Sequence, residues 1–176
     1  LVATAVLPAS MGSTAPRLGL GERHDEIAAG VGSVIHSAAS VAFDLPIEEA
    51  REINVEGTRR VLDFAGAVPD LRRVAYVSTA YVAGDRRGTV YEDDRETGAF
   101  RNSYERSKHE AEAVVRSSTL PWTIARPSII VGESTTGWTA SFNVLYAPLR
   151  AFAAGAYPVL PARRRSPVDV VPVDYV

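Results

Sequence analysis

A tyrosine and a lysine four positions apart carry the first chemical signal in this sequence. Tyr104 and Lys108 belong to the stretch NSYERSKHEAE, residues 102–112, which has strong helix-forming character. Positions i and i+4 share one face of a helix, so the two side chains would project in the same direction. A nearby cation favours a phenolate, so the lysine would lower the pKa of the phenol from its usual value of about 10. The pair therefore predicts an acid/base site, although the same spacing also arises by chance on solvated helices.

Hydroxyl groups at the end of the preceding predicted strand strengthen this interpretation. The run RRVAYVSTAYV is strand-like from about Val74 to Ser78, and Thr79 follows directly. In a parallel α/β sheet, the carboxyl end of a strand lies at the same edge as the start of the next helix. A hydroxyl there would hold a carbonyl oxygen while Tyr104 donates its proton. The alternative is that Ser78 and Thr79 only satisfy backbone groups of the loop.

Strand-like and helix-like segments alternate along the chain and would position these groups. Apolar runs predict strands at 1–7, 33–39, 74–78 and 122–132, the last broken at Pro127, and a further strand near the C-terminus. Periodic apolar residues predict helices at 22–30, 45–67, 103–118 and 138–156. The last helix would start between Trp138 and Asn143 and kink at Pro148. Such alternation predicts a doubly wound parallel sheet with helices on both faces.

The helix expected at 45–67 presents one apolar face. The residues on or near that face are Ile47, Ala50, Ile53, Val61, Leu62 and Ala65. Pro46 is acceptable in the first turn of this helix. We expect this face to pack on the sheet.

Composition excludes several classes of protein. The chain of 176 residues fits one domain, and its formal net charge of -2 gives no attraction to nucleic acid. No run approaches the roughly 20 apolar residues of a membrane span. There is no cysteine, and the three histidines lack the spacing of metal ligands, so no metal site is expected. The absence of cysteine suits a reducing compartment, and we expect a cytoplasmic protein.

Both ends of the sequence resemble internal segments of a longer chain. LVATAVLPAS begins without an initiator methionine or a secretory signal, and SPVDVVPVDYV resembles a strand that enters a further element. We therefore expect residues 1–176 to be a single partial domain, a fragment at both ends.

Five segments in order resemble the extended short-chain dehydrogenase/reductase superfamily. They are VIHSAA (34–39), NVEGTRRVL (54–62), VAYVSTAYVAG (74–84), YERSK (104–108) and ARPSIIVG (125–132). The resemblance implies an NAD(P)-binding Rossmann-like domain in which Thr79 is the catalytic hydroxyl, with Ser78 as the alternative. It also implies that Tyr104 is the acid/base and that Lys108 lowers its pKa and binds the ribose of the nicotinamide.

Further positions match places where the superfamily holds its dinucleotide. The resemblance implies cofactor-binding roles for His36, Ala38, Ala39, Asn54, Ser78, Tyr104, Lys108, Pro127 and Ser128. Ser10 and Met11 would lie near the adenine. Alternatively, His36 and Asn54 are ordinary polar residues whose hydrogen bonds are satisfied at the ends of secondary-structure elements. Pro127 could simply end a strand.

The glycine-rich turn that opens this superfamily is missing from the sequence. That turn and its helix N-terminus hold the pyrophosphate. We therefore expect Leu1 to fall after the first βαβ unit, which the chain would lack. The segment that separates NAD from NADP is missing with it.

Within the superfamily, the chain looks most like the fatty acyl-CoA and thioester reductase branch. The resemblance implies NADP or NAD as cofactor, with NADP favoured, and acyl-CoA or an acyl carrier protein as the source of the thioester. GWTASFNVLY, residues 137–146, would line the acyl channel or belong to the core, and Arg163, Arg164 and Arg165 would meet a phosphate or solvent. The alternatives are an NAD-dependent nucleotide-sugar epimerase or dehydratase, and a non-catalytic dinucleotide-binding protein.

Overall fold

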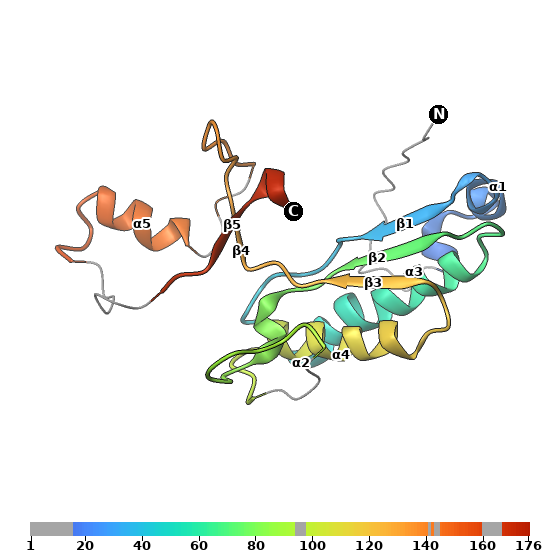
Figure 1. Ribbon diagram of the computed structural model, residues 1–176, viewed down its shortest axis with the longest axis horizontal. Helices are drawn as coiled ribbons and strands as arrows, with labels where there is room; N and C mark the ends of the chain where they lie inside the picture. Colours follow the sequence, from blue (N-terminus) through green and yellow to red (C-terminus); the bar gives the residue numbers. More distant parts are fainter. Residues whose placement is uncertain (1–15, 94–97, 141, 143–144, 160–166) are drawn as a thin grey trace. The chain divides into compact units, whose positions relative to one another are not determined.

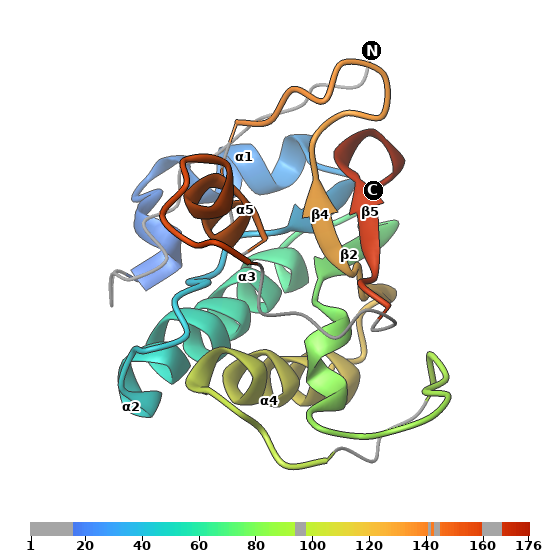
Figure 2. The same cartoon turned by 90° about the vertical axis from the view of Figure 1, so that its left-hand side faces the viewer.

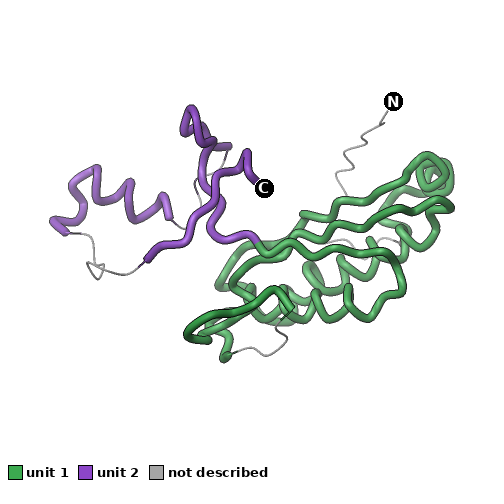
Figure 3. Tube along the Cα trace, viewed as in Figure 1, with its two compact units in different colours: residues 1–126 green, residues 127–176 purple. Residues whose placement is uncertain are grey.

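The described part of the chain gathers into two compact units. The computed structural model describes residues 16–93, 98–140, 142, 145–159 and 167–176. One unit comprises residues 1–126 and the other residues 127–176 (Figure 3). The expectation that the whole chain forms one domain stays a prediction.

The first unit is built on a parallel sheet of three strands. These are β1 (Ser33–His36), β2 (Arg73–Val77) and β3 (Trp122–Ala125), in the order β1-β2-β3. Val74 in the central strand is paired with Val34 on one side and with Trp122 on the other. Each connection between neighbouring strands contains helices, as a parallel arrangement requires. The expected parallel α/β fold is confirmed.

Helices cover one face of this sheet. The helices of this unit are, in chain order, η1 (Pro16–Gly19), α1 (Arg23–Gly30), α2 (Ile47–Arg51), η2 (Glu52–Glu56), α3 (Gly57–Gly66), η3 (Ala80–Ala83) and α4 (Ser103–Ser117). Figures 1 and 2 show α3 and α4 side by side on the same face. Ile35 points to the opposite face and has 77% of its surface exposed. Within the described residues of this unit, one of the two expected helical layers is therefore seen.

The core lies between the sheet and the pair α3 and α4. Val74 and Tyr76 of β2 are each 1% exposed, and they pack with Leu62 and Ala65 of α3 and with Val115 of α4. The same strand places alternate residues on opposite faces, which is why its burial alternates. The core therefore fixes the faces of β2 and α4 from which the candidate site residues project.

One π-helical turn changes the face expected for the helix at 45–67. Ala50, Val61, Leu62 and Ala65 are buried as expected, but Ile53 is only partly buried. η2 is a π-helix and inserts an extra residue per turn, so the apolar face shifts and Asn54 becomes buried. Regular 3.6-residue spacing could not predict this shift.

The second unit holds a two-stranded sheet, one α-helix and one short 3-10 helix. β4 (Ile129–Val131) pairs in parallel with β5 (Val170–Pro172), α5 covers Tyr146–Ala153, and η4 covers Val173–Tyr175. The strand expected at 122–132 is thus two strands of different sheets, separated at Pro127.

The helix start expected between Trp138 and Asn143 is wrong, because α5 begins at Tyr146. Pro148 then lies in the first turn, where no intrahelical hydrogen bond is lost, so it has no reason to kink the helix.

Some expectations fall outside the described residues. They are the strand at 1–7, Ser10, Met11 and the run Arg163 to Arg165. Among the described helices, none has the length and apolar character that crossing a membrane requires.

Candidate active site

Tyr104 and Thr79 meet where β2 ends and α4 begins. Thr79 caps η3 directly after β2, and its hydroxyl accepts a hydrogen bond from Tyr81 N at 3.3 Å. Tyr104 lies in the first turn of α4, near enough to the Thr79 side chain for that hydroxyl to act to lower the pKa of Tyr104. The ring of Phe43 packs at 5.6 Å from the Tyr104 ring. The structure therefore brings together the predicted phenol and the predicted hydroxyl.

Lys108 lies one turn further along α4 and is almost fully buried. Its Nζ donates a hydrogen bond to Val77 O at 2.8 Å and lies 4.2 Å from the centre of the Tyr76 ring. Burial lowers the pKa of Lys108 to about 8, although the Glu112 carboxylate acts to raise it. Lys108 is also the single lysine among the 19 basic residues of the sequence. A buried ammonium of this kind carries a cost that a surface arginine does not.

The predicted lowering of the Tyr104 pKa by Lys108 is not what these contacts produce. Burial raises the pKa of Tyr104, and the neighbouring Thr79 hydroxyl only partly opposes that rise. Lys108 directs its ammonium to the backbone of Val77 instead. A phenol with a raised pKa is protonated at neutral pH, so Tyr104 is set to donate a proton rather than to accept one.

Ser78 is buried beside Thr79 but lies on another side of the turn. Its backbone N–H donates to Ala125 O at 2.7 Å, which extends the pairing between β2 and β3 by one residue. Its hydroxyl helps to lower the pKa of Glu112, yet it makes no hydrogen bond of good geometry with a described residue. The arrangement therefore favours Thr79 over Ser78 as the hydroxyl beside Tyr104.

His36 ends β1 and belongs to a buried hydrogen-bond network. Its Nε2 lies 3.0 Å from Thr58 Oγ1, and Thr58 Oγ1 donates to Asn54 O at 2.6 Å. Since the Thr58 proton is used on Asn54, His36 Nε2 is assigned as the donor to Thr58. Burial lowers the pKa of His36 to about 4, and repulsion from Lys108 adds to this. His36 is therefore a neutral imidazole under ordinary conditions.

Asn54 ties the segment after β1 to α4. Its Oδ1 accepts from Ser40 N at 2.8 Å, and its Nδ2 donates to Ser40 O at 3.1 Å and to Ser107 Oγ at 2.9 Å. Ser107 lies between Tyr104 and Lys108 in sequence and is fully buried. Asn54 thus supports the site by fixing the helix that carries the two catalytic candidates.

The remaining candidates differ in how closely the structure relates them to this site. Ala38 and Ala39 follow β1 in the segment that Asn54 anchors, with Ala38 exposed. Pro127 and Ser128 begin the second unit, and their cofactor-binding roles stay predictions.

The polar groups at this edge fit a nicotinamide dinucleotide. Among the described residues, Lys108 Nζ donates one hydrogen bond, which leaves ammonium protons for ribose hydroxyls. Ser78 Oγ is buried with unused hydrogen-bonding capacity. No group of acidic or histidine side chains in the described ranges could hold a metal ion.

Comparison with known proteins identifies the family. The model of an NAD-binding family described as male sterility protein matches residues 7–176. The chain belongs to this family. The resemblance to the extended short-chain reductases is thereby confirmed at the level of the family.

Curated proteins similar to this chain include several named fatty acyl-CoA reductases. Putative fatty acyl-CoA reductase CG8303 of Drosophila melanogaster is 27% identical over 197 residues, which cover 92% of this chain and 36% of that protein. Fatty acyl-CoA reductase 1 of Rattus norvegicus is 30% identical over 195 residues, covering 93% and 38%. The chain therefore spans less than half the length of these relatives.

A solved structure supports the same family assignment. The terminal R domain from the myxalamid PKS-NRPS biosynthetic pathway is 31% identical, with a TM-score of 0.82. The match covers 95% of this chain and 43% of that one.

Sequence reasoning missed two features of α4. Asn102 Oδ1 accepts from Glu105 N at 2.8 Å, while Glu105 Oε1 accepts from Asn102 Nδ2 at 3.1 Å, so the helix starts with a reciprocal cap. The spacing Asn-x-x-Glu ahead of the helix was the available signal. Glu112, one turn after Lys108, was also missed, and its 2% exposure could not be read from the sequence.

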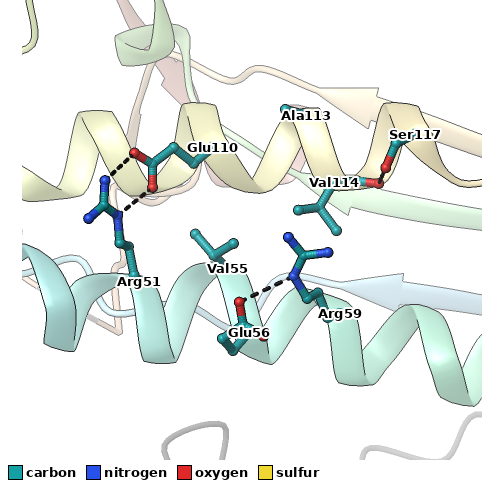
Figure 4. A pocket seen from close by; sticks show the side chains of 8 residues that line it. All are labelled: Arg51, Val55, Glu56, Arg59, Glu110, Ala113, Val114 and Ser117. Carbon is teal, nitrogen blue, oxygen red and sulfur yellow. Dashed lines mark hydrogen bonds and ion pairs between the residues drawn. The ribbon is translucent and has the colours of Figure 1, made fainter.

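A groove of about 490 Å³ lies elsewhere, between α4 and the continuous run of α2, η2 and α3 (Figure 4). Its lining residues are Arg51, Val55, Glu56, Arg59, Glu110, Ala113, Val114 and Ser117. Arg51 and Glu110 bridge it with two hydrogen bonds of 2.8 Å. None of the candidate catalytic residues lines this groove, so it is distinct from the candidate active site.

Proposed function

We propose that this chain carries the catalytic residues of an NAD(P)-dependent reductase that acts on acyl thioesters. The observation that carries the proposal is the meeting of Tyr104, Thr79 and Lys108 at the end of β2. Membership of the male sterility protein family, with relatives named fatty acyl-CoA reductases, supports the choice of a thioester.

Tyr104 would act as the proton donor to the acyl carbonyl oxygen. Its raised pKa keeps the phenol protonated at neutral pH, and Thr79 would donate a second hydrogen bond to the same oxygen. As the carbonyl carbon gains a bond to hydrogen, the carbonyl π electrons move to oxygen, which takes the Tyr104 proton. Breakage of the carbon–sulfur bond then re-forms the carbonyl, and the oxygen's proton leaves with the thiol. The product is an aldehyde.

The cofactor would lie along the segment after β1 and reach Lys108. When bound, NADPH or NADH would supply the hydride, so that a thioester, the reduced cofactor and a proton yield an aldehyde, a thiol and the oxidised cofactor. Lys108 would bind ribose hydroxyls, and His36, Ala38 and Ala39 would line the dinucleotide. We favour NADPH, with acyl-CoA or a carrier-bound acyl group as substrate.

The first test is the phenol itself. The full natural chain that carries residues 1–176 is assayed for loss of NADPH absorbance with a long-chain acyl-CoA, beside Tyr104→Phe. Loss of a general acid costs roughly 100- to 10,000-fold in rate, and we expect a loss of that order. The matched control is Tyr175→Phe, which removes a phenol that is 84% exposed and should leave the rate unchanged.

The outcomes of this assay separate the alternatives. A Tyr104→Phe variant as active as the wild type would contradict the assigned acid. Absence of oxidation with every thioester, with either NADPH or NADH, would instead favour a nucleotide-sugar epimerase or dehydratase, or a non-catalytic binding protein.

A further inference from the structure

Glu112 is a buried carboxylate behind the candidate catalytic residues. It lies on α4 one turn after Lys108 and is 2% exposed. Positions four apart on a helix share a face, so Tyr104, Lys108 and Glu112 form one line along the inward face of α4. A carboxylate at such a depth requires strong partners.

Arg126 supplies the main partner of this carboxylate. Arg126 Nε donates to Glu112 Oε1 at 2.9 Å, and Arg126 Nη2 donates to Glu112 Oε2 at 2.7 Å. Arg116 Nη2 lies 3.4 Å from the same Oε2. A two-point contact between a guanidinium and a carboxylate fixes orientation as well as charge. Arg126 directly follows β3, so the ion pair joins α4 to the end of that strand.

Glu112 acts electrostatically on the catalytic candidates. Burial acts to raise the pKa of Glu112. Arg126 and Ser78 oppose it most strongly, the charge of Arg116 adds to them, and the pKa stays below its ordinary value. The resulting negative charge acts to raise the pKa of Lys108, whereas burial lowers it. Glu112 therefore favours the ammonium form of Lys108, in addition to the hydrogen bond that Lys108 donates to Val77 O.

Other titratable and charged groups surround Lys108 without taking over this role. Tyr76 of β2 faces the ammonium with its ring, and His36 at the end of β1 is neutral. Tyr104, on the preceding turn of α4, is a protonated phenol. Arg126 and Arg116 are cations that pair with Glu112.

We propose that Glu112, held by Arg126, is a positioning residue for the catalytic set that keeps Lys108 in its charged form. The inference rests on the proposed function, because Lys108 acts on a cofactor ribose only in that reading. Glu112 itself touches neither substrate nor cofactor. Its contribution is the negative charge that it places behind Lys108.

Two substitutions should lower the titration midpoint of Lys108. Glu112→Gln removes the negative charge and should lower the titration midpoint of Lys108 by roughly one pH unit. Arg126→Gln removes the main partner that holds Glu112 charged and in place, so it should lower the midpoint as well. Glu110→Gln makes the same chemical change two residues from Glu112. It removes a carboxylate that pairs with Arg51 and Arg106 instead, so it should leave the midpoint unchanged.

The measurement is nuclear magnetic resonance of the full natural chain grown with isotope-labelled lysine. The Lys108 signal is assigned by its loss in Lys108→Arg and followed from pH 6 to 10, roughly two units on each side of the expected midpoint of about 8. An unchanged midpoint in a folded Glu112→Gln variant would overturn the inference. Should that variant fail to fold, Arg126→Gln decides, because a midpoint that rises or stays constant would overturn the inference equally.

A pH profile of kcat distinguishes failure of this inference from failure of the proposed function. In an active enzyme, Glu112→Gln should move the alkaline limb to lower pH, whereas a purely structural role would lower kcat at every pH alike. If the wild type shows no thioester reduction, the proposed function fails, while the titration of Lys108 still tests the role of Glu112.

Discussion

At the scale of single residues, His36 links the site to the pH dependence of stability. The unfolded chain binds a proton at a histidine pKa of 6.5, whereas the folded chain excludes it down to about 4. Between these values the unfolded state holds more protons, so the free energy of unfolding increases as the pH rises. The folded state is accordingly weakened when the pH falls through this window, by up to about 3 kcal/mol.

His36→Gln should flatten this dependence. The glutamine can still donate to Thr58 but cannot titrate, so the free energy of unfolding should change less between pH 4 and 6.5 than in the wild type. Denaturant unfolding at several pH values measures the two slopes. His109→Gln, beside Phe100, provides a control outside the His36 network. Equal slopes in wild type and His36→Gln would show that the imidazole is not the group responsible.

At the scale of elements, the cap of α4 controls the turn that carries Tyr104. Asn102→Ala removes the acceptor for Glu105 N and should destabilise the protein by about 1 kcal/mol. Asn102→Ser keeps a side-chain oxygen at the cap and should retain most of that stability. Thermal unfolding of the two variants compares them directly. A serine variant as unstable as the alanine variant would argue that the Asn102 contact is not a helix cap.

The π turn η2 is an element whose effect extends to the site. Its extra residue turns Asn54 inward, where it reaches both Ser40 and Ser107. A regular helix over the same residues would place Asn54 on another face. The segment after β1 would then lose its connection to α4.

At the scale of the whole molecule, burial is concentrated in the first unit. The buried apolar side chains lie between Ala28 and Val115, whereas Gly132 is the one buried residue among the described part of residues 127–176. Since local stability follows buried apolar contacts, the two units should differ in protection from hydrogen exchange. In the 176-residue chain we expect amides of β4, β5 and α5 to exchange on the order of 100-fold faster than those of β2 and α4. Uniform protection across both units would contradict this expectation.

The sequence by itself determined the alternation of strands and helices and the placement of Tyr104 and Lys108 on one face of α4. These features are local: strands and helices follow from apolar periodicity over a few residues, and a separation of four places two side chains on one helical face. The approach of Thr79 to this face also followed from the general geometry of parallel sheets, in which strand ends and helix starts share an edge.

Only the tertiary structure decided the protonation states of these groups. The predicted fall in the Tyr104 pKa was a property of the pair in isolation, whereas burial against neighbouring elements raises that pKa and directs Lys108 to Val77 O. The role of Glu112 depends on Arg126, which follows a different strand. Desolvation and long-range ion pairs join residues that are distant in sequence, so no local pattern could have predicted them.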